Sequence, residues 1–427
     1  MSKKILLLVL CFIMILPMVF SQGAEDGADD AITLKWQVWI TPNLSLEFYK
    51  EISSAFEAEN PGVTVEIVEA SATTSSSSAD FIRNRLASGD VPDLWMNFQD
   101  VPAFADAGHL WAIPADDPDL QVVNNLLAQE YNGKLYSFAS NAQPQGLMYY
   151  NKKLWAQSGL TEADIPYTWD DLKAVSAKIK AAGFTPIVTG GEWVPLILWD
   201  YFLGSELSKE YPNWWTLINS GEKKWNDPQV LEMVQYLDDL VKSGYFLEGA
   251  LSIGYAQLEQ AFLNEQGVMY PMGSWFTAAE AGAENDWDCG VFSMPTKDGK
   301  VNLTKSGGYG NGYVVYAESE HPELAFELMK KANLDPVYGA KSLQVDGLFS
   351  NITPPLTYPM SPLQEELLAL VGSAEYSRPV LSHPLGEAPP MGVADYFQSN
   401  AEAILTQSYS SLEDLLQKID DFVAEVK

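Results

Sequence analysis

The order of hydrophobic patterns near the start of the chain constrains its fold more than any other feature. Residues 32–40 (ITLKWQVWI) are rich in β-branched and aromatic residues, as in a strand, and residues 48–56 repeat apolar side chains at helical spacing. Residues 63–67 then alternate as a second strand, 81–87 predict a second helix and 94–98 a third strand. This strand–helix–strand–helix–strand order predicts a parallel sheet covered by helices.

Later segments carry the sequence signals of helix starts, so the alternation continues along the chain. The predicted starts are Thr168–Asp171 (TWDD, a capping box), Asp227-Pro228, His321-Pro322 and Ser410–Glu413. Acid pairs such as Asp238-Asp239 fall at helix ends or on solvent faces, and we interpret them as solvated charge. The 427 residues suffice for two or three domains, yet no Ser/Gly linker divides them cleanly. Two domains joined by more than one chain crossing would explain this.

The N-terminus has the pattern of a secretory signal peptide. Two lysines precede an apolar run at residues 5–20, which is short for a membrane span. We expect residues 1–21 to be removed by cleavage after Ser21, and the small, acidic residues 22–31 to form a disordered tether. An uncleaved anchor is the alternative. A lipid anchor at Cys11 is not expected, because a bulky residue precedes it and it lies inside the apolar run.

The charge balance narrows the choice of partners. The chain has 57 Asp and Glu against 25 Lys and Arg, a net charge of −32, whereas nucleic-acid binding needs clustered Lys and Arg. Docking on anionic lipid is disfavoured for the same reason. The 13 Trp, 20 Tyr and 18 Phe suit neutral, hydroxyl-rich ligands as well as a large core. We therefore expect no nucleic-acid partner.

Few residues favour a metal, a cofactor or covalent chemistry. The three histidines, at 109, 321 and 383, are widely separated, so we expect no metal site from them. After signal cleavage Cys289 is the only cysteine, and it has no cationic neighbour in the sequence to favour its thiolate. We interpret it as a small buried hydrophobic residue, and we expect no cofactor.

Several motifs together resemble one family. They are GKLY at 133–136, GLMYYNKKL at 146–154, TWDDL at 168–172, GVMY with GSW between 267 and 275, and the glycine pair 307–308. In this order and spacing they resemble the extracellular solute-binding proteins of ABC importers, and within them the sugar-binding class that includes maltose-binding proteins. Two departures are the Glu265-Gln266 pair, where the family has a serine-rich turn, and the absence of a lipobox. The second favours a free periplasmic protein, with membrane association left open.

The resemblance implies an α/β protein with the two-lobed periplasmic binding protein fold. Each lobe would be a mostly parallel sheet flanked by helices, with a hinge between the lobes. The implied boundaries are 32–140 plus 311–352 for lobe one, 141–306 plus 356–427 for lobe two, and crossings near 139–143, 305–310 and 352–355. The resemblance also implies a monomer without enzyme activity, which delivers a sugar or oligosaccharide to the membrane permease subunits of an ABC importer.

Candidate site residues lie where predicted strands end. Ligands of open α/β sheets bind beyond the carboxyl ends of the strands. A sugar needs a flat ring beneath its C–H face and planar donors and acceptors for its hydroxyls. We expect Trp39, Trp193 and Trp275 as stacking platforms, Gln99, Asp100, Gln143 and Glu192 as hydroxyl readers, and Gly307-Gly308 as a close approach of backbone to ligand. Glu192 and Trp193 follow Gly190-Gly191 after a predicted strand at 185–188. Trp275 follows Gly273 and gains weight from the family resemblance alone.

Some of these residues have a structural alternative. Trp39 serves a core as readily as a site, and Asp100 could cap a helix that starts at Val101. The pair Trp214-Trp215 could be a second platform, but we favour packing.

Three other functions stay open at this stage. A secreted glycoside hydrolase would also be acidic, exported and rich in Trp, and it would need two carboxylates about 5–10 Å apart. The same fold could bind a polyamine or another small cation within aromatic and acidic side chains. A surface lectin would have no importer partner.

Overall fold

The computed structural model describes residues 31–71, 74, 78–97, 101–300, 302–306, 312–373, 375–377 and 392–426. The predicted signal peptide, 1–21, and residues 22–30 of the predicted tether lie outside the described residues. The strands are β1 Ile32–Trp39, β2 Val63–Ala70, β3 Leu94–Asn97, β4 Asn141–Gln145, β5 Leu147–Asn151, β6 Met269–Met272, β7 Cys289–Ser293, β8 Asn302–Ser306, β9 Gly312–Val315, β10 Phe349–Ser350 and β11 Glu375–Ser377.

Helices cover the sheets. They are α1 Leu46–Glu59, α2 Ser78–Ser88, α3 Val101–Asp106, α4 Lys152–Gln157, α5 Trp169–Ala181, α6 Val194–Glu210, α7 Trp214–Ser220, α8 Pro228–Lys242, α9 Tyr255–Leu263, α10 Phe276–Ala281, α11 Pro322–Leu334, α12 Tyr338–Val345, α13 Pro362–Ser373, α14 Val393–Leu405 and α15 Leu412–Glu425. Short 3-10 helices span Pro118–Val122, Leu126–Gln129, Glu162–Asp164 and Ala250–Ser252. None of the described helices is long and apolar enough to cross a membrane.

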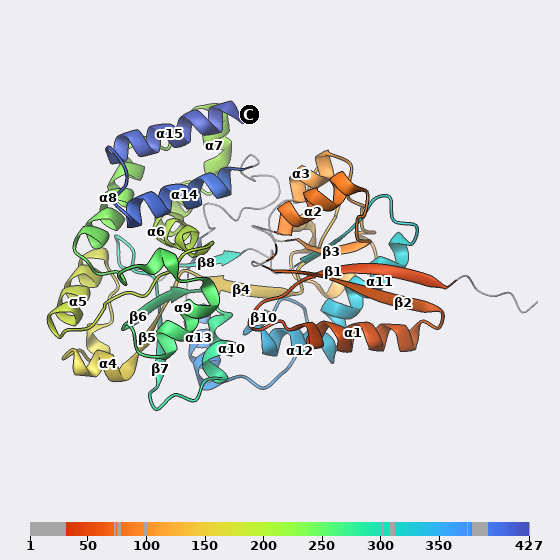
Figure 1. The fold of residues 1–427 in the computed structure, drawn as a ribbon, viewed down its shortest axis with the longest axis horizontal. Helices are drawn as coiled ribbons and strands as arrows, with labels where there is room; N and C mark the ends of the chain where they lie inside the picture. The colour runs from red at the N-terminus through yellow and green to blue at the C-terminus, as the bar shows by residue number, and fades with distance from the viewer. Residues whose placement is uncertain are drawn as a thin grey trace, which may run out of the picture.

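The molecule has two lobes that lie side by side (Figure 1). We name them by their sheets. The β1 lobe contains the sheet β2-β1-β3-β9, and the β5 lobe contains the sheet β6-β5-β7. A further sheet, β10-β4-β8-β11, includes β4 and β10, which lie between the two lobes in Figure 1. β4 and β10, which are far apart in the sequence, therefore lie next to each other between the lobes.

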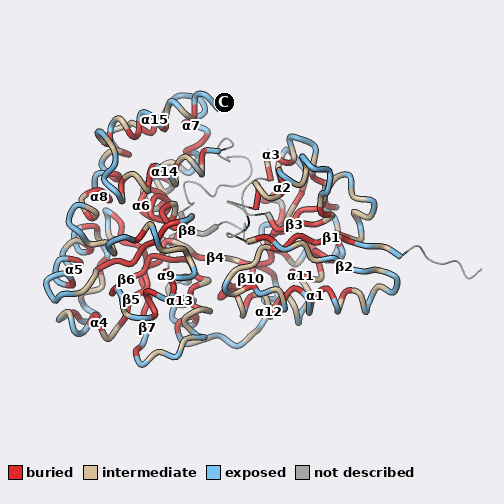
Figure 2. Tube along the Cα trace, viewed as in Figure 1, coloured by how far each residue is buried: buried red, intermediate tan, exposed pale blue. Residues whose placement is uncertain are grey.

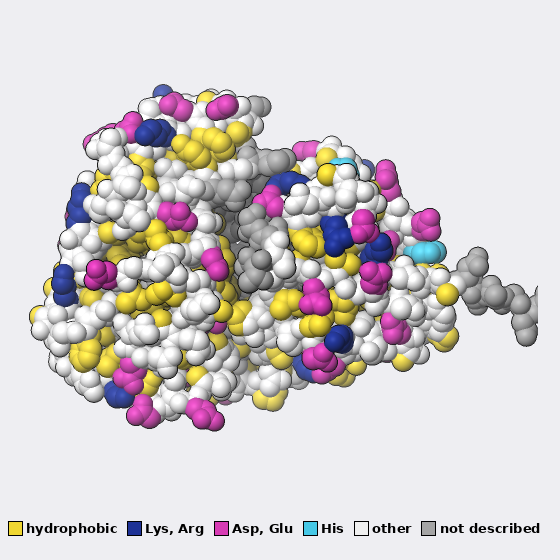
Figure 3. All heavy atoms as spheres, in the orientation of Figure 1, with side chains coloured by type: hydrophobic (Ala, Val, Ile, Leu, Met, Phe, Trp, Pro, Cys, Tyr) yellow, Lys and Arg dark blue, Asp and Glu magenta, His cyan; other side chains and the backbone are white. Residues whose placement is uncertain are grey.

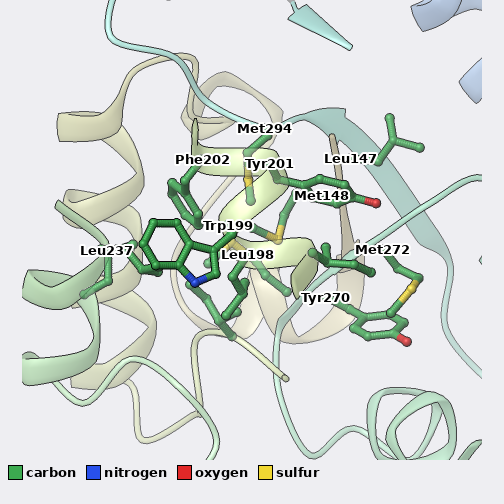
Figure 4. Close-up of a cluster of buried hydrophobic side chains, with 14 of the residues drawn as sticks. Leu147, Met148, Leu198, Trp199, Tyr201, Phe202, Leu237, Tyr270, Met272 and Met294 are labelled. Carbon is green, nitrogen blue, oxygen red and sulfur yellow. The ribbon is translucent and has the colours of Figure 1, made fainter. Parts of the chain in front are cut away.

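Each lobe has its own hydrophobic core. Among the described residues, one large cluster of buried side chains draws on 147–303 and 349–423, and two others draw on 34–138 and 313–352. Figure 2 shows buried residues concentrated along the strands of both lobes. In the β5 lobe, Trp199 and Phe202 of α6 pack with Leu237 of α8 (Figure 4). The exact lobe boundaries stay a prediction.

The sheet of the β1 lobe follows the predicted pattern in three of its four strands. β1 pairs in parallel with both β2 and β3, as the strand–helix alternation predicted. The fourth strand, β9, runs antiparallel to β3, because it enters this lobe after β8 instead of after a helix of the same lobe. β1 and β3 end toward the middle of the molecule (Figure 1). The carboxyl ends of these strands therefore face the other lobe.

The sheet of the β5 lobe departs from a purely parallel arrangement in the same way. β5, which follows the crossing strand β4, pairs antiparallel with both β6 and β7, so its two neighbours run in one direction. The predicted strand at 185–188 contributes only isolated parallel bridges from Ile187, to Phe246 and Met269. Pro186 has no N–H for a longer ladder. The bridge from Ile187 to Met269 still places the segment before Trp193 beside β6.

The predicted helix starts are confirmed. Thr168 Oγ1 accepts from the Asp171 N–H at 3.1 Å, and Asp171 Oδ2 accepts from the Thr168 N–H at 3.0 Å. Hydrogen bonds from the side chain and backbone of Thr168 hold the pKa of Asp171 below its usual range. α8 and α11 begin at Pro228 and Pro322, and the side chain of Ser411 caps α15.

Two predictions about burial are confirmed and one is wrong. Cys289 is buried, and so are Trp214 and Trp215, which pack as we favoured. The prediction that Asp238 is a solvated charge is wrong, because the side chain is fully buried. It accepts hydrogen bonds from Gln407 and Tyr409, whose segment lies 169 or more residues away in sequence. It also pairs with Lys242 at 2.7 Å.

Candidate ligand-binding site

Two of the predicted stacking platforms lie side by side in the β5 lobe, with a third aromatic residue next to them. Trp193 precedes α6, Trp275 precedes α10, and Tyr255 is the first residue of α9. The ring centroid of Trp193 is 4.9 Å from that of Tyr255 and 6.1 Å from that of Trp275. All three side chains are half-buried. This aromatic triad (Trp193, Tyr255 and Trp275) therefore keeps exposed ring surface, unlike the core tryptophans.

Local backbone geometry places each member of the triad. The Gly191 N–H donates to the Ile253 carbonyl at 2.9 Å, so the segment before Trp193 runs against the segment before Tyr255. The indole of Trp275 folds back over Gly273, where a Cβ atom would overlap the ring. A glycine is needed there because any side chain would displace the indole. The Gly190-Gly191 and GSW motifs thus act through close packing around the triad.

Glu192, a predicted hydroxyl reader, lies beside the triad. Its backbone has a φ of 55°, and its Oε2 accepts from the Tyr255 N–H at 3.1 Å, at the N-terminus of α9. An anionic oxygen is favourable there because the first backbone N–H groups of a helix lack helical partners. Glu192 is nevertheless exposed. Its carboxylate therefore holds Tyr255 in place and still faces solvent next to Trp193.

A second carboxyl group below the triad is buried. Glu259 of α9 is 2% exposed, and its Oε1 accepts from the Tyr255 hydroxyl at 2.6 Å. Burial raises the pKa of Glu259 to about 7, and the hydrogen bond from Tyr255 opposes that shift. Burial also raises the pKa of Tyr255 well above its usual value. The hydrogen bond to the buried Glu259 thus fixes the position of the Tyr255 hydroxyl and the orientation of its ring.

Gln143 lies on the strand that links the two lobes. It is 8% exposed and stands opposite Ser306 in the pairing of β4 with β8. The next residue, Pro144, accepts at its carbonyl from the Ser274 N–H at 3.0 Å. The segment that carries Trp275 is therefore hydrogen-bonded to the strand that carries Gln143. The hinge predictions at 139–143 and 352–355 stay predictions.

The β1 lobe contributes the third predicted platform. Trp39 is half-buried at the last position of β1, and its carbonyl accepts from the Tyr49 hydroxyl at 3.2 Å. Four residues later, Asn43 Nδ2 donates to the Trp275 carbonyl at 3.1 Å. The carboxyl end of β1 therefore meets the β5 lobe near the triad. Gln99, Asp100, Gly307 and Gly308, and with them residues 307–310 of a predicted crossing, lie outside the described residues.

Sequence reasoning missed two residues of this region. Tyr255 contacts Glu192 across 63 positions of sequence, and Asn43 contacts Trp275 across 232. Tyr255 directly follows Gly254, and a nearby glycine was one of the signals that selected Trp193. For Asn43 the local sequence carries no signal, because its partner lies in the other lobe.

Acidic side chains lie on the surface of both lobes. Figure 3 shows Asp and Glu side chains on each side of the lobe boundary. Within the described ranges no group of three His, Cys, Asp or Glu side chains could hold a metal ion. The site offers aromatic faces, carboxylates and amides. Groups of these kinds are able to stack on a ligand and to hydrogen-bond to it.

One sizeable cavity among the described residues lies away from the triad. It has a volume of about 840 Å³ and lies on the β1 lobe, between the end of α1, α11 and residues 352–357. Its lysines are already paired, since Lys330 contacts Asp117, Asp119 and Glu327 within 3.2 Å. We therefore locate the candidate site at the triad, where exposed aromatic and polar groups meet at the lobe boundary, and not at this groove.

The chain has the fold of the two-lobed periplasmic binding proteins. A solved chitin oligosaccharide binding protein superposes with a TM-score of 0.80 at 22% identity, covering 93% of this chain and 99% of that one. The solute-binding protein RafE in complex with raffinose superposes with a TM-score of 0.74 at 21% identity, covering 93% and 100%. At these identities the likeness shows the shared fold.

The sequence shows the family. Residues 41–335 match the model of the bacterial extracellular solute-binding proteins, and the chain belongs to this family, as the motifs predicted. A curated relative, the multiple sugar-binding protein of Streptococcus mutans serotype c, is 27% identical over 293 residues. That alignment spans 66% of this chain and 66% of the relative.

Proposed function

We propose that this protein is the substrate-binding component of an ABC importer, which captures a sugar or oligosaccharide between its lobes and delivers it to the permease. The observation that carries the proposal is the aromatic triad, half-exposed in the β5 lobe at its contact with the β1 lobe. Family membership supports a role in binding an extracellular solute. The relative and the structural neighbours are named for binding multiple sugars, chitin oligosaccharide and raffinose, which favours a carbohydrate ligand.

The chemistry of the triad suits a carbohydrate. A pyranose ring has an apolar C–H face that packs on an indole, and Trp193 and Trp275 each present part of such a surface. Hydroxyl groups need acceptors and donors, which Glu192 and Gln143 supply as planar groups. In this proposal Trp39 contributes from the β1 lobe. Gln99, Asp100, Gly307 and Gly308 keep their predicted roles as ligand contacts.

Capture proceeds by closure of the lobes. A ligand that contacts both lobes binds the closed form better than the open form, so it shifts the population toward the closed form. The predicted hinge segments would absorb the change. No bond of the ligand is made or broken, and the permease subunits recognise the closed protein. We further propose that the first 21 residues direct export, that the mature protein is periplasmic and that it acts as a monomer.

A ligand screen tests this proposal. Wild-type protein is heated with chito-oligosaccharides, raffinose-type and maltose-type sugars, and with spermidine as the cationic alternative. A ligand that binds only the native state increases the free energy of unfolding, by about 2.7 kcal/mol when its concentration is 100 times its Kd. The melting temperature rises as a result. We expect at least one sugar to raise the melting temperature. A shift with spermidine and with no sugar would overturn the carbohydrate assignment.

A second assay separates binding from catalysis. The protein is incubated with chromogenic glycosides and with whichever sugar raises the melting temperature. We expect the sugar to be recovered intact. Steady turnover, lost when Glu192 or Glu259 is replaced by Gln, would favour the glycoside hydrolase instead.

A further inference from the structure

One side chain of the β1 lobe joins two distant segments at the lobe boundary. Asn43, in the loop after β1, donates from Nδ2 to the Trp275 carbonyl at 3.1 Å and to Asp346 Oδ1 at 3.2 Å. A side-chain amide nitrogen has two hydrogens, so it can serve both acceptors at once. Trp275 belongs to the aromatic triad of the β5 lobe, whereas Asp346 follows α12, which packs on the core of the β1 lobe.

A second contact joins the same two segments. Gly347 has a φ of 60°, and a Cβ atom there would lie 2.5 Å from Thr277 Oγ1 and 2.9 Å from the Ser274 carbonyl. The backbone after α12 therefore packs directly against the residues on either side of Trp275. Ser274 and Thr277 are fully buried at this contact. The boundary is close-packed here, and the position of Trp275 depends on groups from both lobes.

Acidic and phenolic groups surround Asp346. It is 6% exposed and is faced by Glu259 and Tyr255 of α9, Tyr49 of α1 and Tyr313 of β9. Burial raises the pKa of Asp346 to about 7, the charge of Glu259 adds to the rise, and the hydrogen bond from Asn43 opposes it. These described neighbours include no cation. Burial at this contact therefore favours the neutral form of Asp346.

We propose that Asn43 is a positioning residue that couples contact between the lobes to the orientation of the Trp275 platform. The interlobe latch (Asn43, the Trp275 carbonyl and Asp346) forms when the lobes meet, and it then holds the backbone of Trp275 so that the indole faces the ligand. The inference rests on the proposed function, because it assigns Trp275 to the ligand. The latch itself is a contact of the protein and can be measured without a ligand.

The variant Asn43→Ala removes both hydrogen bonds. We expect its affinity for the sugar that stabilises the wild type to fall about tenfold, because two acceptors at the boundary lose their donor. The matched control is Asn60→Ala, since Asn60 is equally half-buried and donates from Nδ2 to the Phe56 carbonyl at 2.8 Å within one lobe. We expect the control to bind within threefold of wild type. Equal losses in the two variants would overturn the latch.

A readout without ligand separates the latch from the proposed function. Small-angle scattering of the unliganded proteins should give a larger radius of gyration for Asn43→Ala than for wild type and for Asn60→Ala. This holds even if no sugar binds and the proposed function fails. If Asn43→Ala has the same radius of gyration as wild type, and the same affinity for any sugar that binds, the latch is overturned. The proposed function is not affected by that result. If the alanine variant does not fold, the near-isosteric Asn43→Asp is used, which replaces the donor by an acceptor and should open the protein further.

The pH profile gives a signature that a merely structural role of Asp346 would lack. If closure buries Asp346, the closed form takes up a proton between the ordinary carboxyl range and about pH 7, so closure strengthens as pH falls through that window. We expect the affinity of wild type to be about fivefold or more higher at pH 5.5 than at pH 7.5. Asp346→Asn, which stays neutral and can still accept from Asn43, should show less than a twofold change. Identical profiles in the two proteins would contradict the latch.

Discussion

Gly273 has no room for a side chain, because a Cβ atom there would overlap the indole of Trp275. Trp193 and Tyr255 complete the aromatic triad with ring contacts of their own. Tyr255 is in turn fixed at two points, since its N–H donates to Glu192 and its hydroxyl to Glu259. The ring surface offered to a ligand is thus set by short contacts between single residues.

Replacing Trp275 by Ala should weaken binding of the stabilising sugar without unfolding the protein. The half-buried indole provides stacking area whose loss costs about 2 kcal/mol, or roughly 30-fold in Kd. Titration followed by calorimetry measures the change. The control is Tyr167→Ala, because Tyr167 is an aromatic side chain that is 55% exposed outside the triad. If both variants bind as wild type does, Trp275 is not a platform.

Glu259 should make stability depend on pH. Burial raises its pKa to about 7 in the folded protein, whereas an unfolded Glu titrates near 4.3. The folded state then holds a proton that the unfolded state has lost, so this group's stabilisation is complete below about pH 4 and is lost as pH rises to about 7. Glu259→Gln, which can still accept from Tyr255, should remove that loss.

Urea unfolding at pH 5 and pH 8 tests this prediction. The fall in unfolding free energy from pH 5 to pH 8 should be smaller in Glu259→Gln than in wild type, by about 1–3 kcal/mol. Glu248→Gln serves as control because Glu248 is exposed. A wild-type-like fall in Glu259→Gln would show that Glu259 is not held neutral by burial.

Helices and strands were predicted from the sequence to the extent that their signals are local. The start of α5 follows from the four residues TWDD, and the starts of α8 and α15 follow from Asp227-Pro228 and Ser410–Glu413. The apolar stripe of α1 follows from 3.6-residue spacing. The direction of β5 and β9 was not predictable in this way. The sequence pattern of a short apolar strand does not distinguish parallel from antiparallel pairing. The pairing depends on where the chain crosses between the lobes.

The candidate site was predictable to a similar extent. Trp193 was predicted because a glycine pair and a predicted strand end precede it, whereas Trp275 gained its weight from the family resemblance, and the structure brings the two together. Their assignment to a ligand stays a prediction. Asn43, Tyr255 and the buried Asp238 were missed because their partners lie between 63 and 303 residues away. A single sequence carries no pattern for such contacts.

The capping box of α5 provides a test at the scale of one helix. Thr168→Ala removes the acceptor of the Asp171 N–H and should lower the unfolding free energy by about 1 kcal/mol. Chemical denaturation measures the change. Thr64→Ala, at an exposed position of β2, should change stability by less than about 0.5 kcal/mol. Equal effects of the two substitutions would mean that the cap contributes nothing.

At the scale of the whole molecule, the two lobes have separate cores and meet through few elements. β4 and β10 lie between them, and the loop after β1 meets the segment around Trp275. Such an arrangement lets each lobe move as a unit about the crossing segments. The proposed function requires that motion, because only a closed form contacts a ligand from both sides.

Closure can be measured in solution. Saturating amounts of the stabilising sugar should reduce the radius of gyration seen by small-angle scattering, because ligand shifts the population toward the closed form. Trp275→Ala should need more sugar for the same change. A sugar that binds tightly in calorimetry but leaves the scattering profile unchanged would show that binding does not close the lobes.

The most direct measurement is a crystal structure of the protein grown with the sugar that raises its melting temperature most. We expect a sugar ring packed on the indole of Trp193 or Trp275, with hydroxyl groups within hydrogen-bond distance of residues from both lobes. A sugar bound at another surface, or one that contacts the β5 lobe alone while the triad is empty, would contradict it.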